Sequence, residues 1–316
     1  MVVYRVATEH TRHRGAGSLI QMGYIFLVIA LFSGVTKGYC GKKTSQHTSS
    51  FRLSVFANVI RTLLCTAIGF AVTLLEGSIY FITPSVNLLL ITALSGISTA
   101  IFVVSWLISV RKSAYMLMDI FLMVGVLVPL VLSMLFFNET IRPSQWVGIL
   151  ILLIATIIMC SYNNNIKAKI TLPTFLLLMA CGIANGITDF SQKLFVKALP
   201  DIPVSIFNLY TYIFAAITLI ITHLLLKPND SMQPKRVVKS IFGYIFIMAL
   251  CLFLNSYFKT IAAATLSSVI LYPLNQGASL VLSSIMAAGI FKEKLTAKVV
   301  LGMITSFIGL LIINVL

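Results

Sequence analysis

The sequence predicts an all-α membrane protein with ten transmembrane helices in two five-helix inverted repeats. Of its 316 residues, 59% are hydrophobic and only 10% are charged, which is too little charge to cover the surface of a soluble domain. Several apolar runs are longer than the ~18 residues that a membrane span needs. In addition, one stretch recurs 154 residues further along the chain. Composition, run length and internal repetition therefore agree on the fold class.

The apolar runs are expected to be helices, because lipid cannot satisfy exposed backbone groups. The alternation typical of a membrane barrel is absent. Charged or Pro-containing breaks divide the sequence into ten runs. The expected helices lie at 22–40, 52–75, 85–110, 114–137, 144–162, 173–195, 203–226, 240–260, 264–290 and 297–316.

A polar linker divides these helices into five and five. Residues 163–172 include three asparagines and two lysines, and they separate a first repeat at 22–162 from a second at 173–316. An odd number of spans in each repeat inserts the two repeats in opposite orientations. Residues 1–21 are rich in arginine and histidine and are expected to form a disordered basic tail.

The repetition is clearest where the fourth expected helix of each half ends. Phe137-Asn138-Glu139-Thr140-Ile141 corresponds to Phe291-Lys292-Glu293-Lys294-Leu295, and Gly148 in the following helix corresponds to Gly302. Each glutamate ends a span beside a basic residue, so we expect both to hold a loop at the interface rather than to contact substrate. The glycines are expected to allow close packing of helices.

A shorter match links the first helices of the two halves. Ser33-Gly34-Val35-Thr36-Lys37 lies opposite Asn185-Gly186-Ile187-Thr188-Asp189. Lys37 and Asp189 occupy matching positions and carry opposite charges, which suggests a charge pair that forms in one transport state and breaks in the other. The alternative places Lys37 among the lipid headgroups, three residues before the expected end of the first helix.

These motifs resemble a known family. The stretch Ser113–Met159 resembles the EamA-type repeat of the drug/metabolite transporter superfamily, with a glutamate ending the fourth span and a glycine in the fifth. The stretch Tyr272–Leu316 resembles the same repeat and also the small multidrug resistance transporters. The latter carry a glutamate in their first span for proton coupling, whereas Ser33 and Asn185 stand at the matching positions here.

The resemblance implies a secondary-active transporter that exports a small metabolite by alternating access between the repeats. A flippase for a lipid or lipid-linked intermediate on the same scaffold is the alternative. An enzyme is not expected, because the sequence has no HExxH, GxSxG or Walker motif. For the same reason we expect no catalytic residue, cofactor or metal ligand.

The net charge of +15 is expected to serve the membrane rather than nucleic acid. Lysines and arginines lie at span ends, where they meet anionic lipid headgroups. The expected partners are a small-molecule substrate and lipid, and the expected location is the cell membrane. Coupling to a proton or ion stays open, as does the choice between monomer and homodimer. The charge distribution places both termini outside the cell, whereas the resemblance implies that both are cytoplasmic.

Polar side chains inside spans are the candidate substrate ligands, because they are costly in lipid. Asn185, Asp189 and Gln192 lie at helical spacing on one face of the sixth helix, although Lys193 could simply neutralise Asp189. In the fourth helix, Asp119 lies four residues after Tyr115.

Three more candidate site residues are Tyr272 and Asn275, which lie near Pro273, and the cation Arg61. Pro273 in the ninth helix frees a carbonyl, so Tyr272 and Asn275 beside it are expected to bind a ligand or to join helices. Arg61 lies about ten residues into the second helix. It is expected to pair with Asp119 or to snorkel to the interface.

Overall fold

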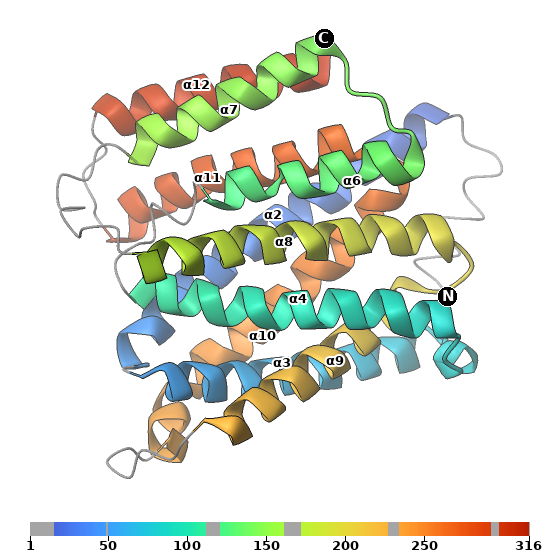
Figure 1. Cartoon of the computed structure of the whole chain (residues 1–316), viewed down its shortest axis with the longest axis vertical. Helices are drawn as coiled ribbons and strands as arrows, with labels where there is room; N and C mark the ends of the chain where they lie inside the picture. Colours follow the sequence, from blue (N-terminus) through green and yellow to red (C-terminus); the bar gives the residue numbers. More distant parts are fainter. Residues whose placement is uncertain are drawn as a thin grey trace. The chain divides into compact units, whose positions relative to one another are not determined.

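The computed structural model describes residues 16–48, 50–111, 121–160, 172–226, 234–291 and 297–315. The described part of the chain contains ten α-helices, one short 3₁₀ helix and no strand (Figure 1). The α-helices are α2 (Ala16–His47), α3 (Phe51–Leu75), α4 (Val86–Arg111), α6 (Leu127–Phe137), α7 (Pro143–Cys160), α8 (Leu172–Ala198), α9 (Val204–Leu225), α10 (Pro234–Thr265), α11 (Ser268–Phe291) and α12 (Ala297–Val315). The all-α prediction is confirmed, and each expected helix has a counterpart.

Within the described ranges, six helices are long and apolar enough to cross a membrane: α2, α3, α4, α8, α9 and α10. Three shorter apolar helices cover Phe121–Phe137, Pro143–Ile158 and Val300–Asn314. Of the ten α-helices in the described part of the chain, six therefore meet the length and hydropathy of a full span.

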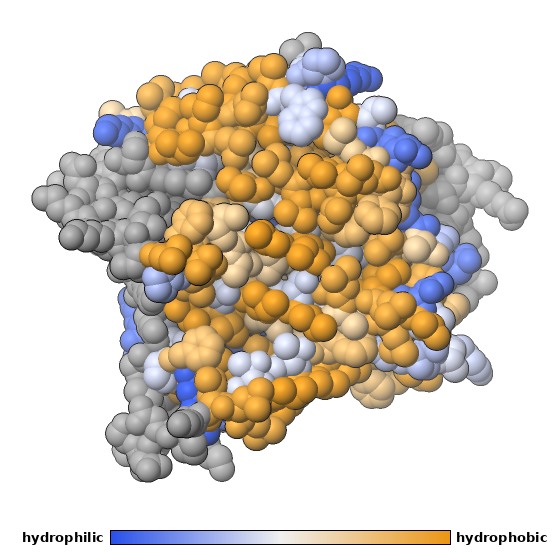
Figure 2. Space-filling model, in the orientation of Figure 1, coloured by the Kyte–Doolittle hydropathy of each residue, from blue (hydrophilic) through white to orange (hydrophobic). Residues whose placement is uncertain are grey.

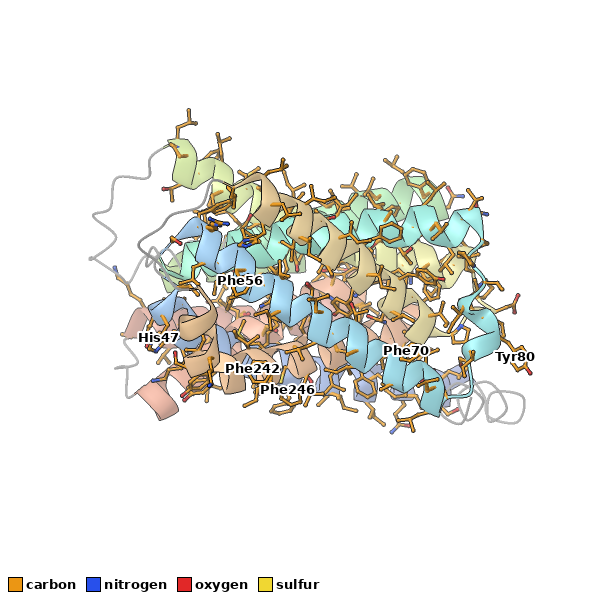
Figure 3. The ribbon with its side chains drawn as sticks, turned by 90° about the horizontal axis from the view of Figure 1, so that it is seen from below. His47, Phe56, Phe70, Tyr80, Phe242 and Phe246 are labelled. Atoms are coloured by element: carbon orange, nitrogen blue, oxygen red, sulfur yellow. The ribbon has the colours of Figure 1, made fainter. Side chains whose placement is uncertain are left out.

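The face of the molecule drawn in Figure 2 is largely apolar, as its orange colour shows. On α3 and α10, Phe70, Phe242 and Phe246 are 48%, 46% and 44% exposed, and Figure 3 shows them projecting from these helices. Tyr80, in the 3₁₀ helix Ile79–Ile82, is 92% exposed. Exposed aromatic side chains over such an area indicate a lipid-facing surface.

The chain forms two compact units, and each combines segments from both halves of the sequence. Unit 1 comprises residues 1–104 and 191–266, and unit 2 comprises residues 105–190 and 267–316. The chain passes from one unit to the other within α4 and again within α8.

In unit 1, α10 packs along α2 and α3, and α3 packs along α9. Leu53 and Ala57 of α3 join Ile241 and Ile245 of α10 in an apolar core. In unit 2, α7 lies along α12, as Figure 1 also shows, and α11 contacts α6, α7 and α12. Both units are thus held together mainly by helix-on-helix packing.

Helix boundaries in unit 2 repeat at the offset seen in the sequence. Helix α6 ends at Phe137 and α11 at Phe291, while α7 begins at Pro143 and α12 at Ala297. Asn138 stops α6 by adopting a left-handed conformation, with φ 52°, which a short polar side chain tolerates better than most. Corresponding helices also pair within the units: α3 with α9, α6 with α11, and α7 with α12.

Helix α2 is longer than expected in both directions. It begins at Ala16, inside the segment that was expected to be a disordered tail, and it continues to His47. The expected end near residue 40 was wrong because Lys42 and Lys43 mark where apolar sequence ends, not where a helix must end. Backbone hydrogen bonds can continue into water. Lys37 therefore lies ten residues before the end of its helix.

Candidate functional site

Unit 1 contains a connected group of polar side chains in its interior. Arg61 has Cys65 and Tyr212 as electrostatic neighbours, and Cys65 in turn neighbours Lys37. Ser256 neighbours Tyr212 and accepts a hydrogen bond from Gln192. This group, called the Arg61 cluster below, comprises Lys37, Arg61, Cys65, Gln192, Tyr212 and Ser256.

Arg61 lies on a polar stripe of α3. The stripe consists of Asn58, Arg61, Thr62 and Cys65, whose spacing of three and four residues places them on one helix face. All four side chains are buried, and Arg61 is only 3% exposed. Its Nε finds no hydrogen-bond acceptor among the described residues. The guanidinium thus lies inside the unit, which argues against the alternative that Arg61 snorkels to the interface.

Backbone carbonyls of α10 fix the neighbours of Arg61. The Cys65 Sγ donates to the Ala249 carbonyl at 3.3 Å, and the Tyr212 hydroxyl donates to the Leu252 carbonyl at 3.1 Å. Neither side chain carries a charge at neutral pH. Two neighbours of Arg61, on α3 and α9, are therefore neutral groups held in fixed orientations.

Gln192 connects α8 to the cluster. Its Nε2 donates to the Ser256 Oγ at 3.2 Å, while its Oε1 has no donor within the described ranges. Gln192 is 1% exposed. A buried amide with one unused acceptor is costly unless another molecule completes it.

Lys37 is the second cation of the cluster. It is half-buried on α2, and its Nζ lies 5.6 Å from the centre of the Phe102 ring on α4, which is within cation–π range. Cys65 and Cys251 are its electrostatic neighbours. These contacts, together with the length of α2, argue against the headgroup position considered from the sequence.

Unit 2 brings together two other expected site residues. The Tyr272 hydroxyl donates to the backbone carbonyl of Asp189 at 2.6 Å, and Asp189 is 2% exposed. Asn185, one turn earlier on α8, is half-buried. Asn275, one turn after Tyr272 on α11, is buried, and its Oδ1 has no donor in the described part of the chain.

The expected ligands are thus divided between the units. Arg61, Lys37 and Gln192 belong to unit 1, whereas Asp189 and its neighbours belong to unit 2. Asp119 and Tyr115 lie outside the described residues, so the expected pairing of Asp119 with Arg61 stays a prediction.

Sequence reasoning missed several buried polar groups of unit 1. On α9, Asn208, Thr211 and Tyr212 follow one another at the spacing of a helix face, which is the signal that identified the stripe on the sixth helix. Further buried side-chain atoms that lack a hydrogen-bond partner among the described residues are Ser95 Oγ, Ser205 Oγ, Asn208 Oδ1 and Thr211 Oγ1. Cys65 gave no such signal, because a cysteine inside an apolar run is normally a packing residue.

Glu139 has a structural position. Its Oε2 accepts a hydrogen bond from the Ser268 backbone N–H at 2.9 Å, and Ser268 is the first residue of α11. The Ser268 Oγ also forms a 2.8 Å hydrogen bond with the Ser133 Oγ of α6. A carboxylate at a helix start satisfies a free N–H and interacts favourably with the helix dipole.

Comparison with known proteins supports the resemblance found in the sequence. Residues 172–315 match the EamA-like transporter family, so the recognition is confirmed for the second half of the chain. The chain is an integral, multi-pass membrane protein. No curated protein matches it.

A solved structure, titled only as the crystal structure of a protein, shares the fold. The TM-score is 0.74 at 14% sequence identity, and the match covers 92% of this chain and 96% of the other. At that identity the likeness concerns the fold alone.

Proposed function

We propose that this chain is a secondary transporter that moves a small metabolite across the cell membrane. The observation that carries the proposal is the match of residues 172–315 to the EamA-like transporter family. The family consists of transporters, and this fits a chain with many apolar helices. Export is the direction that the resemblance implies.

The pairing of corresponding helices supports alternating access between two inverted repeats. In α3 with α9 and in α7 with α12, one helix comes from each half of the sequence. Helices related by an inverted repeat can exchange roles when a transporter changes the side to which it opens. The repeat boundaries at 22–162 and 173–316 are part of this proposal.

The Arg61 cluster is the proposed substrate site of unit 1. Transporters bind substrate through polar groups near the bilayer midplane, and Arg61 lies near the middle of α3. The unused polar atoms on Gln192 and Arg61 would be completed by a bound substrate. Tyr272, Asn275, Asn185 and Asp189 are proposed to contribute to transport from unit 2.

The test is transport by the purified chain in proteoliposomes. A library of labelled metabolites is offered with and without a pH gradient, and uptake is compared with that of empty vesicles. We expect saturable uptake of at least one metabolite class. A second arm measures movement of a fluorescent phospholipid between leaflets. Lipid movement without metabolite uptake would replace the transporter by a flippase.

A further inference from the structure

We propose that the Arg61 cluster binds the oxyanion of its ligand, a carboxylate or a phosphate of a small metabolite that also carries a hydroxyl or amino group. This assignment rests on the proposed function only for the claim that the ligand is transported. Binding itself follows from the geometry of unit 1.

The first argument is the energetic cost of Arg61. A buried cation in a membrane helix is unfavourable unless a partner, water or a ligand compensates it. Its electrostatic neighbours in the described residues, Cys65 and Tyr212, are uncharged at neutral pH. The guanidinium is therefore held in place by the fold without a counter-charge from those neighbours.

The second argument is the charge and shape of the Arg61 side chain. Of the acidic side chains described in unit 1, Glu76 accepts a hydrogen bond from Tyr257, and Asp201 is exposed in the loop before α9. A buried guanidinium favours an anion over a cation or a neutral ligand. A planar guanidinium binds carboxylates and phosphates through paired hydrogen bonds.

The third argument concerns the rest of the ligand. The Gln192 Oε1 meets no donor among the described residues, and its Nε2 donates to Ser256, a neighbour of Tyr212. An acceptor needs a donor, which a hydroxyl or amino group supplies. One ligand with an oxyanion and a donor can therefore satisfy both the Arg61 Nε and the Gln192 Oε1.

The test measures thermal stability of the purified full-length chain in detergent. The probes at millimolar concentration are malate and glycerate for carboxylates, glycerol 3-phosphate and inorganic phosphate for phosphates, glycerol as the neutral match and ethanolamine as the cationic match. A ligand that binds only the folded state raises the melting temperature. We expect this rise with carboxylate or phosphate probes and none with glycerol or ethanolamine.

The variants are Arg61→Gln, Arg61→Lys and Arg52→Gln. Loss of a charge-assisted hydrogen bond predicts a roughly 10- to 100-fold weaker Kd for Arg61→Gln, with a partial effect for Arg61→Lys. Arg52 lies on the same helix and also lacks an acceptor at Nε, but it is only half-buried in the first turn. Arg52→Gln should therefore bind like the wild type.

Three results would overturn the inference: no stabilisation by any oxyanion, equal stabilisation by glycerol, or oxyanion binding that survives Arg61→Gln.

The melting temperature of the protein without ligand gives a further check. Arg61→Met should raise the melting temperature, because it removes an uncompensated buried charge. A fall would reveal a partner such as Asp119 and would also overturn the inference. If the chain takes up only neutral or cationic metabolites, it is a transporter but the oxyanion site is refuted. If oxyanions bind in an Arg61-dependent way but no metabolite is taken up, the oxyanion site stands and the transporter proposal is refuted.

Discussion

Glu139 shows how a single repeated residue can be functional for the fold rather than for transport. Its carboxylate binds the first backbone N–H of α11, next to the Ser133–Ser268 hydrogen bond. Asn138, which precedes it, ends α6 in a left-handed conformation. In the first copy of the motif, a helix stop at Asn138 is thus followed by a helix cap from Glu139.

Glu139→Ala should destabilise the protein by about 0.5–2 kcal/mol, the usual cost of losing a helix cap. Glu139→Gln keeps an acceptor and should lose less than half of that. Thermal unfolding in detergent measures both. Transport per folded molecule should stay near the wild-type rate, and a selective loss of transport in Glu139→Gln would instead assign the carboxylate to the substrate pathway.

Asp189 belongs to a different class of residue because it is buried and lies on a polar stripe. A carboxylate inside a membrane helix costs roughly 2.5–3.5 kcal/mol on insertion scales. Asp189→Asn, and likewise Asp119→Asn, should insert normally but lose most uptake or efflux. Asp201→Asn, an acid-to-amide change in an exposed loop, is the matched control. Wild-type transport in both Asp189→Asn and Asp119→Asn would reduce these residues to packing groups.

At the residue scale, the sequence could identify polar positions but not their partners. Helical spacing placed Asn185, Asp189 and Gln192 on one face of α8, yet Gln192 joins unit 1 while Asp189 belongs to unit 2. Which neighbour meets each residue depends on helices far away in the chain. Spacing along one helix contains no information about those contacts.

At the scale of elements, glycines decide how closely helices approach. Gly182 and Gly186 on α8 have the three-residue separation typical of tight membrane helix pairs. A Cβ on Gly182 would lie 2.2 Å from the Phe121 carbonyl oxygen, and one on Gly186 would lie 2.3 Å from that of Gly125. The segment Phe121–Phe137 and α8 therefore touch through their backbones.

Gly182→Ala and Gly125→Ala should each destabilise the protein by about 1–3 kcal/mol, because the added methyl group forces the two backbones apart. The control is Gly243→Ala on α10, where a Cβ meets nothing within 4 Å. That variant should be neutral or up to about 1 kcal/mol more stable, since alanine favours a helix over glycine. Melting temperatures in one detergent give the comparison, and equal tolerance at all three sites would refute the close crossing.

Helix identity was predictable, whereas helix length was not. Long apolar runs allow only helices in lipid, so all ten were expected near their observed positions. Helices α2 and α10 extend beyond the apolar runs because a helix can continue into water, where the lysine side chains are solvated. This extension moved Lys37 from an expected interfacial position to the interior of its helix.

At the scale of the whole molecule, each compact unit draws corresponding helices from both halves of the sequence. Such mixing is expected if two repeats interlock around a pseudo-twofold axis. The charge pair between Lys37 and Asp189 that the repeat suggests stays a prediction of the sequence. The number of membrane crossings is the property on which the inverted repeat depends, because five crossings per half are needed to turn the second half over.

The last prediction is therefore that the shorter helices also cross the membrane. Helices α7 and α12 have 18 and 19 residues, which at ~1.5 Å per residue span ~27–28 Å. This length is close to the hydrocarbon thickness of ~30 Å, and modest thinning of the bilayer closes the difference.

The measurement is the accessibility of single cysteines at positions 21, 141, 166 and 316, in a chain without its native cysteines, to a membrane-impermeant maleimide on intact cells. With ten crossings, positions 21, 141 and 316 share one side and position 166 lies on the other. If only the six candidate spans α2, α3, α4, α8, α9 and α10 cross, position 141 would change sides and join position 166, which would remove the inverted repeat.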